Sequence, residues 1–372
     1  MENRVYIADC EDYNIDSVTA AVERTLDAFG GAGALLNGGK RVLVKPNMLI
    51  PKKPEDAATT HPIVVEAVCA AFVKAGADVS IIDSTGGPHT KIVLRLLSGK
   101  TGIKDAAKRS GAKISFNMST RKVTYPEGKI LQNFDILAPV FDADLVVNVA
   151  KAKTHCFMTM TGCVKNLFGC IPGMGKPLLH RKYPKHEDFA AMLVDICEYI
   201  NPGFSILDAV YGMEGQGPAS GDPKHIGVIA GGISPYAVDV AQCYLMGQRA
   251  ERVHTIQDAV ARGLVSDDPD LLTWLGENPS RFRKSFKPAI NHKNNNIPKI
   301  LRSCTGCGDC ARICPMKCIK ITDGKTAGGE IATDETAGGK TTTGKIAVIE
   351  EKDCIKCYCC HEFCPAKSIT LD

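Results

Sequence analysis

The sequence lacks the long apolar runs that a membrane-spanning protein needs. No stretch approaches the roughly 20 apolar residues that cross a bilayer, and Met1 to Cys10 contains no hydrophobic region of a signal peptide. We therefore expect a cytoplasmic protein that has no membrane partner.

Signatures of the common nucleotide sites are also missing. The phosphate-binding loop G-x-x-x-x-G-K-S/T does not occur, and no G-x-G-x-x-G turn follows a predicted strand. These absences argue against a Walker-type ATP site and against a nicotinamide or flavin fold.

Aromatic residues are scarce in the one strongly basic stretch of the chain. Residues 281–303 carry seven Lys or Arg side chains and no acidic one, but only Phe282 and Phe286 are available to stack on bases. We interpret this stretch as a basic linker that docks electrostatically on the C-terminal segment. We expect no nucleic-acid partner.

Cysteine, by contrast, is abundant, with 17 in the chain. Two runs, beginning at Cys304 and at Cys354, each spell C-x2-C-x2-C-x3-C-P. In this bacterial ferredoxin pattern three cysteines hold one iron–sulfur cluster and the fourth holds its neighbour. One 4Fe-4S cluster is therefore expected on Cys304, Cys307, Cys310 and Cys364, and a second on Cys354, Cys357, Cys360 and Cys314. A zinc site fits less well, because zinc takes four ligands and would leave cysteines over.

The two cysteine runs continue as a repeat. Cys318 aligns with Ser368, so we expect that Cys318 is not a ligand, and Cys359 has no counterpart in the first run, where Asp309 stands in its place. Residues 323–344 between the runs are rich in Gly and Thr, which predicts a surface loop inserted in the module. The remaining cysteines are scattered and odd in number, which favours free thiols in a reducing compartment.

Residues 1–280 alternate short apolar runs with amphipathic stretches. This pattern is typical of an α/β domain with a large, mostly parallel sheet covered by helices. Strands are predicted at 4–8, 41–45, 78–83, 113–116, 144–149, 204–208 and 226–230, and helices at 15–29, 62–75, 187–200 and 235–246. Residues 121–134 are predicted to form a hairpin. Residues 304–372 are expected to form a small α+β ferredoxin-like domain with two clusters.

Polar side chains follow several of the predicted strands. In open α/β sheets ligands bind beyond the carboxyl ends of the strands, so these groups should meet at one edge. The candidates for substrate binding are Lys45, Asn47, His61, Asp83, Lys151, Lys153, Thr161, Gly162, Asn166 and Lys176. No acidic residue interrupts the lysine-rich segment 151–180, which predicts a ligand that carries carboxylate or phosphate.

The candidate catalytic residues are His155, His180 and Lys165. A reduction also needs protons, and a histidine that titrates near neutral pH is the usual donor, while Lys165 would hold the anion. His61 has an alternative role as the cap of the helix that begins at Pro62.

Three further cysteines, Cys156, Cys163 and Cys170, recur every seven residues. On a continuous helix they would lie about 10 Å apart, which is too far to share a metal ion. We therefore interpret them as buried thiols, with a reactive thiolate beside a lysine as the alternative.

Several short motifs of the large domain occur together. They are Lys45-Pro-Asn47, Thr60-His-Pro62, Asp83-Ser84, Lys153-Thr-His155, Thr161-Gly-Cys-Val-Lys-Asn-Leu-Phe-Gly169, Pro172-Gly173 and His180. Together they resemble the large prokaryotic family that carries the domain of unknown function 362, in its version with a C-terminal ferredoxin module. The resemblance covers about residues 1–290. It implies the domain layout and a shared site in segment 151–180, but it implies no substrate.

These features favour an iron–sulfur oxidoreductase of an anaerobic type of metabolism. It would exchange electrons with a redox partner protein and pass them to a small anionic substrate in the large domain. One alternative is an electron carrier whose large domain only docks a partner enzyme. Another is a metal-handling or assembly protein that uses the remaining cysteines. The oxidoreductase would turn over a small anion, and the carrier would only form a complex with its partner and be reduced reversibly. The metal-handling protein would bind metal beyond two clusters per chain.

Overall fold

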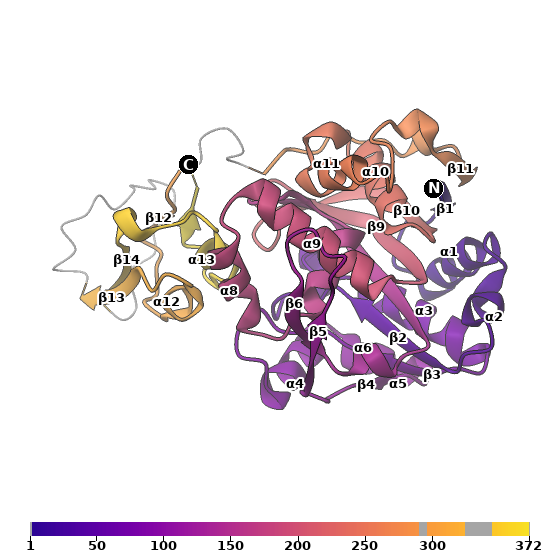
Figure 1. Ribbon diagram of the computed structural model, residues 1–372, viewed down its shortest axis with the longest axis horizontal. Coiled ribbons are helices and arrows are strands. Elements are labelled where there is room, and N and C mark those ends of the chain that lie inside the picture. Colours follow the sequence, from indigo (N-terminus) through magenta and orange to yellow (C-terminus); the bar gives the residue numbers. More distant parts are fainter. Residues whose placement is uncertain (1, 290–295, 324–343, 372) are drawn as a thin grey trace.

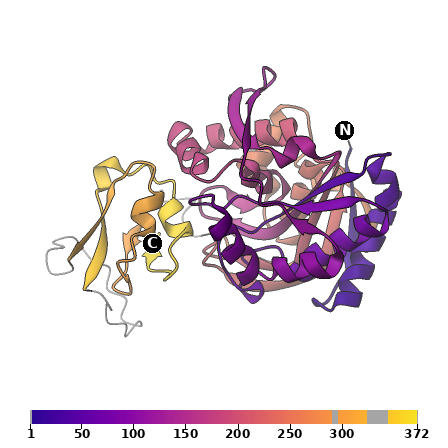
Figure 2. The same ribbon diagram turned by 90° about the horizontal axis from the view of Figure 1, so that it is seen from below.

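The structure is a computed structural model that describes residues 2–289, 296–323 and 344–371. A large α/β domain lies beside a small C-terminal module, and α13 (Cys359–Glu362) lies on the side of the module that faces the large domain (Figure 1, Figure 2). This arrangement confirms the fold class expected from the sequence. Within the described ranges, no helix has the length and apolar character needed to cross a membrane.

The large domain is built on a nine-stranded mixed sheet with the order β11-β1-β10-β9-β7-β2-β3-β4, to which β8 is added beside β7. The strands are β1 (Arg4–Asp9), β2 (Arg41–Pro46), β3 (Asp78–Ile81), β4 (Lys113–Ile114), β7 (Leu145–His155), β8 (Thr159–Thr161), β9 (Phe204–Glu214), β10 (Asp222–Gly232) and β11 (Thr273–Gly276). The run from β4 to β9 is parallel, whereas β10 is antiparallel to both β9 and β1. The sheet is thus mostly parallel, as predicted, with antiparallel pairing at β9, β10 and β1.

Helices cover both faces of this sheet. One face packs against α1 (Ile15–Asp27), α3 (Pro62–Lys74) and α5 (Ile103–Ser110), and the other against α7 (Cys163–Asn166), α9 (His186–Ile200), α10 (Pro235–Leu245) and α11 (His254–Ala261). The remaining helices are α2 (Gly31–Leu36), α4 (Lys91–Lys100), α6 (Pro139–Asp142) and α8 (Gly175–Lys182). All four helices predicted from the sequence are present. The ones it missed have at most ten residues and show too few turns for a clear apolar period.

Strand β7 differs most from its prediction. It was expected to end at Val149, but it continues to His155, and all eleven of its residues are buried. It lies between β2 and β9, so the polar side chains of its second half are enclosed by neighbouring strands and loops. The sequence predicts that Lys151, Lys153 and His155 follow the strand, because lysine is almost never fully buried without a partner.

Two other local predictions are confirmed. Strands β5 (Thr120–Thr124) and β6 (Asn133–Leu137) pair as the expected antiparallel hairpin. Cys156, Cys163 and Cys170 are buried thiols, as expected. Cys156 follows β7, Cys163 is the first residue of α7, and Cys170 ends the next short helix, so the three do not share one continuous helix.

The C-terminal module contains β12 (Lys299–Ile300), α12 (Asp309–Ile313), β13 (Ile319–Asp323), β14 (Lys345–Ile349), α13 and β15 (Ile369–Thr370). β13 and β14 form an antiparallel pair in which Asp323 lies opposite Lys345. The Gly/Thr-rich loop predicted between them falls, apart from its ends, on residues 324–343, outside the described residues.

The first part of the basic stretch that precedes the module packs on the large domain. Phe282 and Phe286 are buried in the core of the large domain, and the backbone N–H of Lys287 donates a hydrogen bond of 2.9 Å to Glu214. Residues 281–289 therefore pack on the large domain, and the predicted docking of the basic stretch on the C-terminal segment stays a prediction. Residues 290–295 lie outside the described residues.

Candidate functional site

Four cysteines from both runs line one cavity within the module. They are Cys304, Cys307, Cys310 and Cys364, so the last cysteine of the second run joins three from the first. Apolar side chains such as Ile300, Ile321 and Ile369 surround them. Four thiols that converge on one apolar hollow are the donor set of a 4Fe-4S cluster, so these residues fit the group.

A second group of thiols forms around Cys360. Burial raises the pKa of Cys360, and the neighbouring thiols of Cys357, Cys354, Cys310 and Cys314 add to the rise, which shows that they lie close together. Cys310 lines the first cavity. The remaining four thiols, Cys354, Cys357, Cys360 and Cys314, are those that the motif assigns to the second cluster, three from the second run and one from the first.

Another cavity lies where the module meets the large domain, and we call it the interdomain cavity. Its large-domain lining includes Lys45, Asn47, Asp83, Lys153, Thr161, Lys165, Asn166, Lys176 and His180, and its module lining is Cys359, Glu362 and Phe363. The cavity has a volume of about 70 Å³. That is room for roughly five to seven water-sized groups, so a ligand that fits it is small.

Lys45 and Asp83 form a buried ion pair in the wall of the interdomain cavity. Their charged atoms lie 3.0 Å apart, and their side chains are 1% and 4% exposed. Asp83 also accepts hydrogen bonds from the backbone N–H groups of Met48 (2.7 Å) and Ser84 (2.8 Å). The charge of Lys45 is therefore balanced, and the pair fixes the ends of β2 and β3 against each other.

Lys153 is held by neutral groups. Its ammonium donates hydrogen bonds to Asn47 Oδ1 (2.9 Å) and to the carbonyl of Ala58 (2.7 Å). Asn47 in turn donates to Asn166 Oδ1 (3.1 Å), and Asn166 donates to the carbonyl of Lys45 (3.0 Å). Burial lowers the pKa of Lys153 well below its usual value, and the nearby Lys165 adds to the effect. An anion beside Lys153 would reverse part of that shift.

Lys165 and Lys176 are half-buried lysines of the same cavity. Burial lowers the pKa of both, and for Lys176 it lowers the value to about 7. Lys176 donates hydrogen bonds to the carbonyls of Ser84 (2.7 Å) and Thr85 (3.2 Å), and the ammonium of Lys165 lies 5.8 Å from the ring centre of Phe168. A lysine with a pKa near 7 can hold or release a proton at neutral pH.

Two buried polar atoms in the large-domain wall of the cavity have no hydrogen-bond partner among the described residues. They are Nδ1 of His180 and Oγ1 of Thr161, and their residues are 4% and 3% exposed. His180 stacks on Phe189 at 4.2 Å, and burial lowers its pKa to about 3, so its imidazole is neutral at neutral pH. Because buried polar groups are normally paired, these two atoms point to a polar ligand or water in the cavity.

Three predicted site residues lie elsewhere. Lys151 pairs with the buried Asp208 at 3.0 Å instead of facing the cavity. His61 caps α3 by accepting a hydrogen bond from the N–H of Ile63 (3.3 Å), as its alternative interpretation held. Gly162 lies against α10, where a Cβ atom would be 2.2 Å from a carboxylate oxygen of Asp239.

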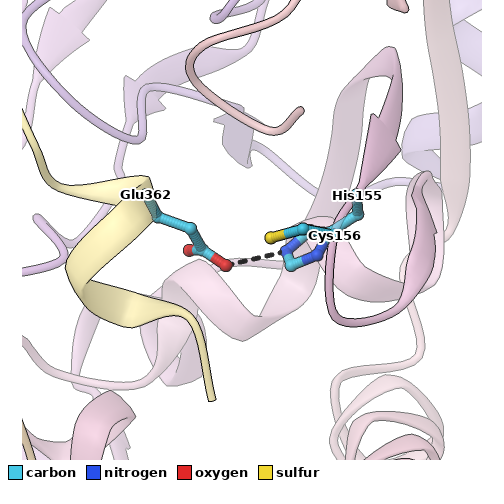
Figure 3. A group of neighbouring side chains, drawn as sticks. All are labelled: His155, Cys156 and Glu362. Carbon is cyan, nitrogen blue, oxygen red and sulfur yellow. Dashed lines mark ion pairs between the residues drawn. The ribbon is translucent and has the colours of Figure 1, made fainter. Parts of the chain in front are cut away.

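His155 lies beside the cavity lining and contacts the module. Its Nδ1 accepts hydrogen bonds from the backbone N–H groups of Phe157 (3.0 Å) and Met158 (3.2 Å), and its Nε2 lies 3.2 Å from Oε1 of Glu362 (Figure 3). The potential metal-binding atoms of His155, Cys156 and Glu362 lie within 4.8 Å of one another. The adjacent lysines, which act electrostatically on Glu362, disfavour a cation there.

The residues that sequence reasoning missed come from the module. Cys359, Glu362 and Phe363 reach the interdomain cavity from α13 and the residue after it. The departure of Cys359 from the repeat was visible in the sequence. Nothing in the sequence indicated that Glu362 or Phe363 would contact the large domain.

Comparison with known families agrees with this architecture. The model of the family described as a domain of unknown function (DUF362) matches residues 42–244, more than half of the chain. The chain belongs to the DUF362 family. A second model, described as a 4Fe-4S dicluster domain, matches residues 303–368. The C-terminal module is thus an iron–sulfur domain, and the DUF362 region contains most of the interdomain cavity's lining.

Two individual proteins are similar to this DUF362 member. The thylakoid-associated protein sll1697 of Synechocystis sp. is 32% identical over 240 residues, which are 64% of this chain and 73% of that protein. The lactate racemase apoprotein of Thermoanaerobacterium thermosaccharolyticum shares 14% identity with a TM-score of 0.42. The similar region covers 66% of this chain and only 57% of the racemase chain.

Proposed function

We propose that this protein is an iron–sulfur oxidoreductase that passes electrons to a small anion bound in the interdomain cavity. An electron-transfer role follows from the 4Fe-4S dicluster domain. The observation that supports a reaction in the large domain is the shared cavity, whose walls combine lysines of the DUF362 domain with residues on either side of Cys360.

The proposed cofactors are two 4Fe-4S clusters, which supply one-electron transfer when bound. Cys304, Cys307, Cys310 and Cys364 would hold one, and Cys354, Cys357, Cys360 and Cys314 the other. The cavity lined by the first four thiols supports this assignment.

The side chains of the interdomain cavity suit an anion that gains a proton. Lys153 and Lys165 would hold the negative charge, since both are buried or half-buried and lack a directly bonded carboxylate among the described residues. His180 and Thr161 would take the polar atoms of the ligand. Lys176, with a pKa of about 7, is better suited to deliver the proton than His180, whose pKa is about 3.

We further propose a redox partner protein and a cytoplasmic location. Cys307 is exposed, which gives a partner access to the first group of thiols. All 17 cysteines lie in the described residues and none of them forms a disulfide, which suits a reducing compartment. The similar Synechocystis protein is named for its association with thylakoids, so fractionation of the native host cell tests this proposal.

Anaerobic reoxidation tests the function. The reconstituted protein is reduced and mixed with a panel of small carboxylates and phosphates, and the visible absorbance of the clusters is followed. We expect one compound to reoxidise the wild type quickly and Lys165→Ala at least about tenfold more slowly, because a charge that binds the anion is lost. Lys182→Ala, at an exposed position of α8, is the control. If no anion reoxidises the protein but a partner protein does, at a rate unchanged in Lys165→Ala, the molecule is an electron carrier.

A further inference from the structure

We propose that helices α4 and α8 form a surface that binds the lipid head groups of an anionic membrane. We call it the α4–α8 face and define it by the exposed apolar and basic side chains of the two helices. Its apolar side chains are Ile92, Leu96, Met174 and Leu178. The inference is independent of the proposed function, because it concerns neither the clusters nor the interdomain cavity. We expected no membrane partner because the sequence lacks a spanning segment, but contact with the surface of a bilayer needs none.

Helix α4 is apolar on two sides. Leu94 and Leu97 pack in the core of the large domain, as the inner side of a surface helix should. Ile92 and Leu96 lie one turn apart on the outer side and are 69% and 65% exposed, the highest values of any large apolar side chain among the described residues. The outer side of a surface helix is normally polar, so a second apolar side indicates a partner.

Helix α8 has the same design. Met174 at its start and Leu178 one turn later are 44% and 58% exposed, while Pro177 and His180 are buried. Four of the eight exposed large apolar side chains in the described part of the chain therefore lie on these two short helices. Single exposed apolar residues are ordinary, whereas a group of them marks a site of interaction.

The two helices lie close together at their N-terminal ends, on the half of the large domain that is nearer to the module (Figure 1). An added Cβ atom at Gly173, just before α8, would lie 2.8 Å from the carbonyl oxygen of Gly87, just before α4. The N–H of Gly173 donates a hydrogen bond of 2.7 Å to Oγ of Ser84, and Lys176 donates one of 2.7 Å to the carbonyl of Ser84. One broad surface can therefore contact both helices at once.

The α4–α8 face is positively charged. Its exposed cations are Lys91, Arg95 and Lys100 of α4 and Arg181 and Lys182 of α8. None of the five forms an ion pair among the described residues, whereas exposed cations elsewhere, such as Arg41, Lys74 and Lys113, do. Segments 84–104 and 145–186, which contain the two helices, have no acidic residue. The charge is therefore not balanced locally, and it favours an anionic partner.

A lipid surface matches this combination better than a protein does. Anionic head groups would lie against the cations, and the apolar side chains would reach the boundary of the acyl chains. A second copy of the chain would bring the same positive charge against itself. Protein interfaces are enriched in aromatic residues and depleted in lysine, whereas α4 and α8 together have four lysines and no Phe, Tyr or Trp.

Cosedimentation with lipid vesicles tests this inference. The full-length holoprotein is centrifuged with vesicles of equal parts phosphatidylglycerol and phosphatidylcholine, and separately with vesicles of phosphatidylcholine alone. The double variant Ile92→Ser with Leu178→Ser removes one apolar side chain from each helix. The double variant Lys91→Gln with Lys182→Gln removes one charge from each. Iron content and visible absorbance show whether each variant retains its clusters.

Leu271→Ser is the matched control. Leu271 is 59% exposed, but segment 263–280 around it contains no basic residue. It lies just before β11, at the end of the large domain that is away from the module (Figure 1). Loss of this leucine removes as much exposed apolar surface as Leu178→Ser, at a place that should not meet an anionic membrane.

We expect the wild type and Leu271→Ser to bind the anionic vesicles equally, and each double variant to bind at least about tenfold more weakly. High salt and uncharged vesicles should weaken binding by a similar factor, because the head-group charge is screened or absent. No binding of the wild type to anionic vesicles, or equal binding by all variants, would overturn the inference. If the wild type instead forms a dimer or a complex with an acidic protein, and both double variants lose it, the face is a protein interface and the inference is also overturned.

Discussion

The two cysteine runs share one motif but lie in different surroundings. The cavity of Cys304, Cys307, Cys310 and Cys364 is lined by module residues alone, and Cys307 is exposed. The helix of the second run, α13, faces the large domain instead, and Cys357, Cys359 and Cys360 are all buried. Identical ligand spacing therefore leaves one side of the module open and the other docked.

The difference comes from the residues between the cysteines. Cys359 and Glu362 reach the interdomain cavity, whereas Asp309, which stands where Cys359 would be, forms an ion pair with Arg312 at the surface. The motif fixes the metal ligands, and the residues that it leaves free decide what each half contacts. In the proposed function the open side meets the redox partner and the docked side meets the substrate.

Removal of single thiols should have the largest effect and tests whether the runs exchange ligands. Cys364→Ser should disturb the cluster held by the first run, and Cys314→Ser the cluster held by the second. In each case we expect iron to fall from about eight toward about four per chain. Iron analysis and electron paramagnetic resonance of the reduced protein measure the change.

Cys318→Ser is the matched control for those variants, because Cys318 is buried beside Cys314, with 3.4 Å between the sulfurs, but is not a proposed ligand. Its iron content should equal that of the wild type. An equal loss of iron in Cys318→Ser would contradict the ligand assignment.

Gly86→Val should undock the second run and leave the first unchanged. The new side chain needs the space that the ring of Phe363 occupies, and such overpacking costs about 1 to 3 kcal/mol. Hydrogen exchange measured by mass spectrometry should become about tenfold faster or more in residues 358–371. Gly87→Ala is the control, since a Cβ atom at Gly87 meets no atom within 4 Å. Equal exchange in both variants would show that Phe363 does not hold the module.

The smallest expected effect is a pH dependence confined to the docked side. Because burial lowers the pKa of Lys176 to about 7, propionate binding should weaken several-fold as the pH rises through that value and the ammonium is lost. Lys176→Arg should flatten the profile. The described residues that line the first cavity include no lysine, so no matching dependence is expected there.

The same shift predicts how stability depends on pH. Between about 7 and 10.5 the unfolded chain holds a proton on Lys176 that the folded chain lacks, so this group makes the free energy of unfolding rise with pH in that window. Chemical denaturation of the wild type and of Lys176→Met compares the two slopes. A wild-type slope no steeper than that of the variant would contradict the shift.

The parts of the site that depend on strand ends could be predicted from the sequence. Lys45 lies near the carboxyl end of β2 and Asp83 follows β3, and the carboxyl ends of neighbouring parallel strands meet. Lys151 and His155 could not be placed, because β7 continues through them and gives each a buried partner of its own. A short polar stretch after an apolar run has the same appearance whether the strand stops or continues.

The contribution of the module could not be predicted at all. Contact between Phe363 and Gly86 depends on the shapes of two surfaces that are far apart in the sequence and follow no period or motif. The cysteine ligands are the opposite case, because their spacing alone carries the chemistry. Sequence reasoning thus covered the fold and one wall of the cavity, and docking supplied the other.

The pairing of Asp323 with Lys345 has a practical consequence for engineering. These two residues lie on either side of segment 324–343 in the sequence and directly opposite each other in the β13–β14 pair. The ligand spacings within each run do not depend on the length of the sequence that joins this pair. A longer insertion also costs little stability, because the entropy of loop closure grows slowly with loop length. A fluorescent reporter or affinity tag inserted there would have both of its ends anchored on the same strand pair.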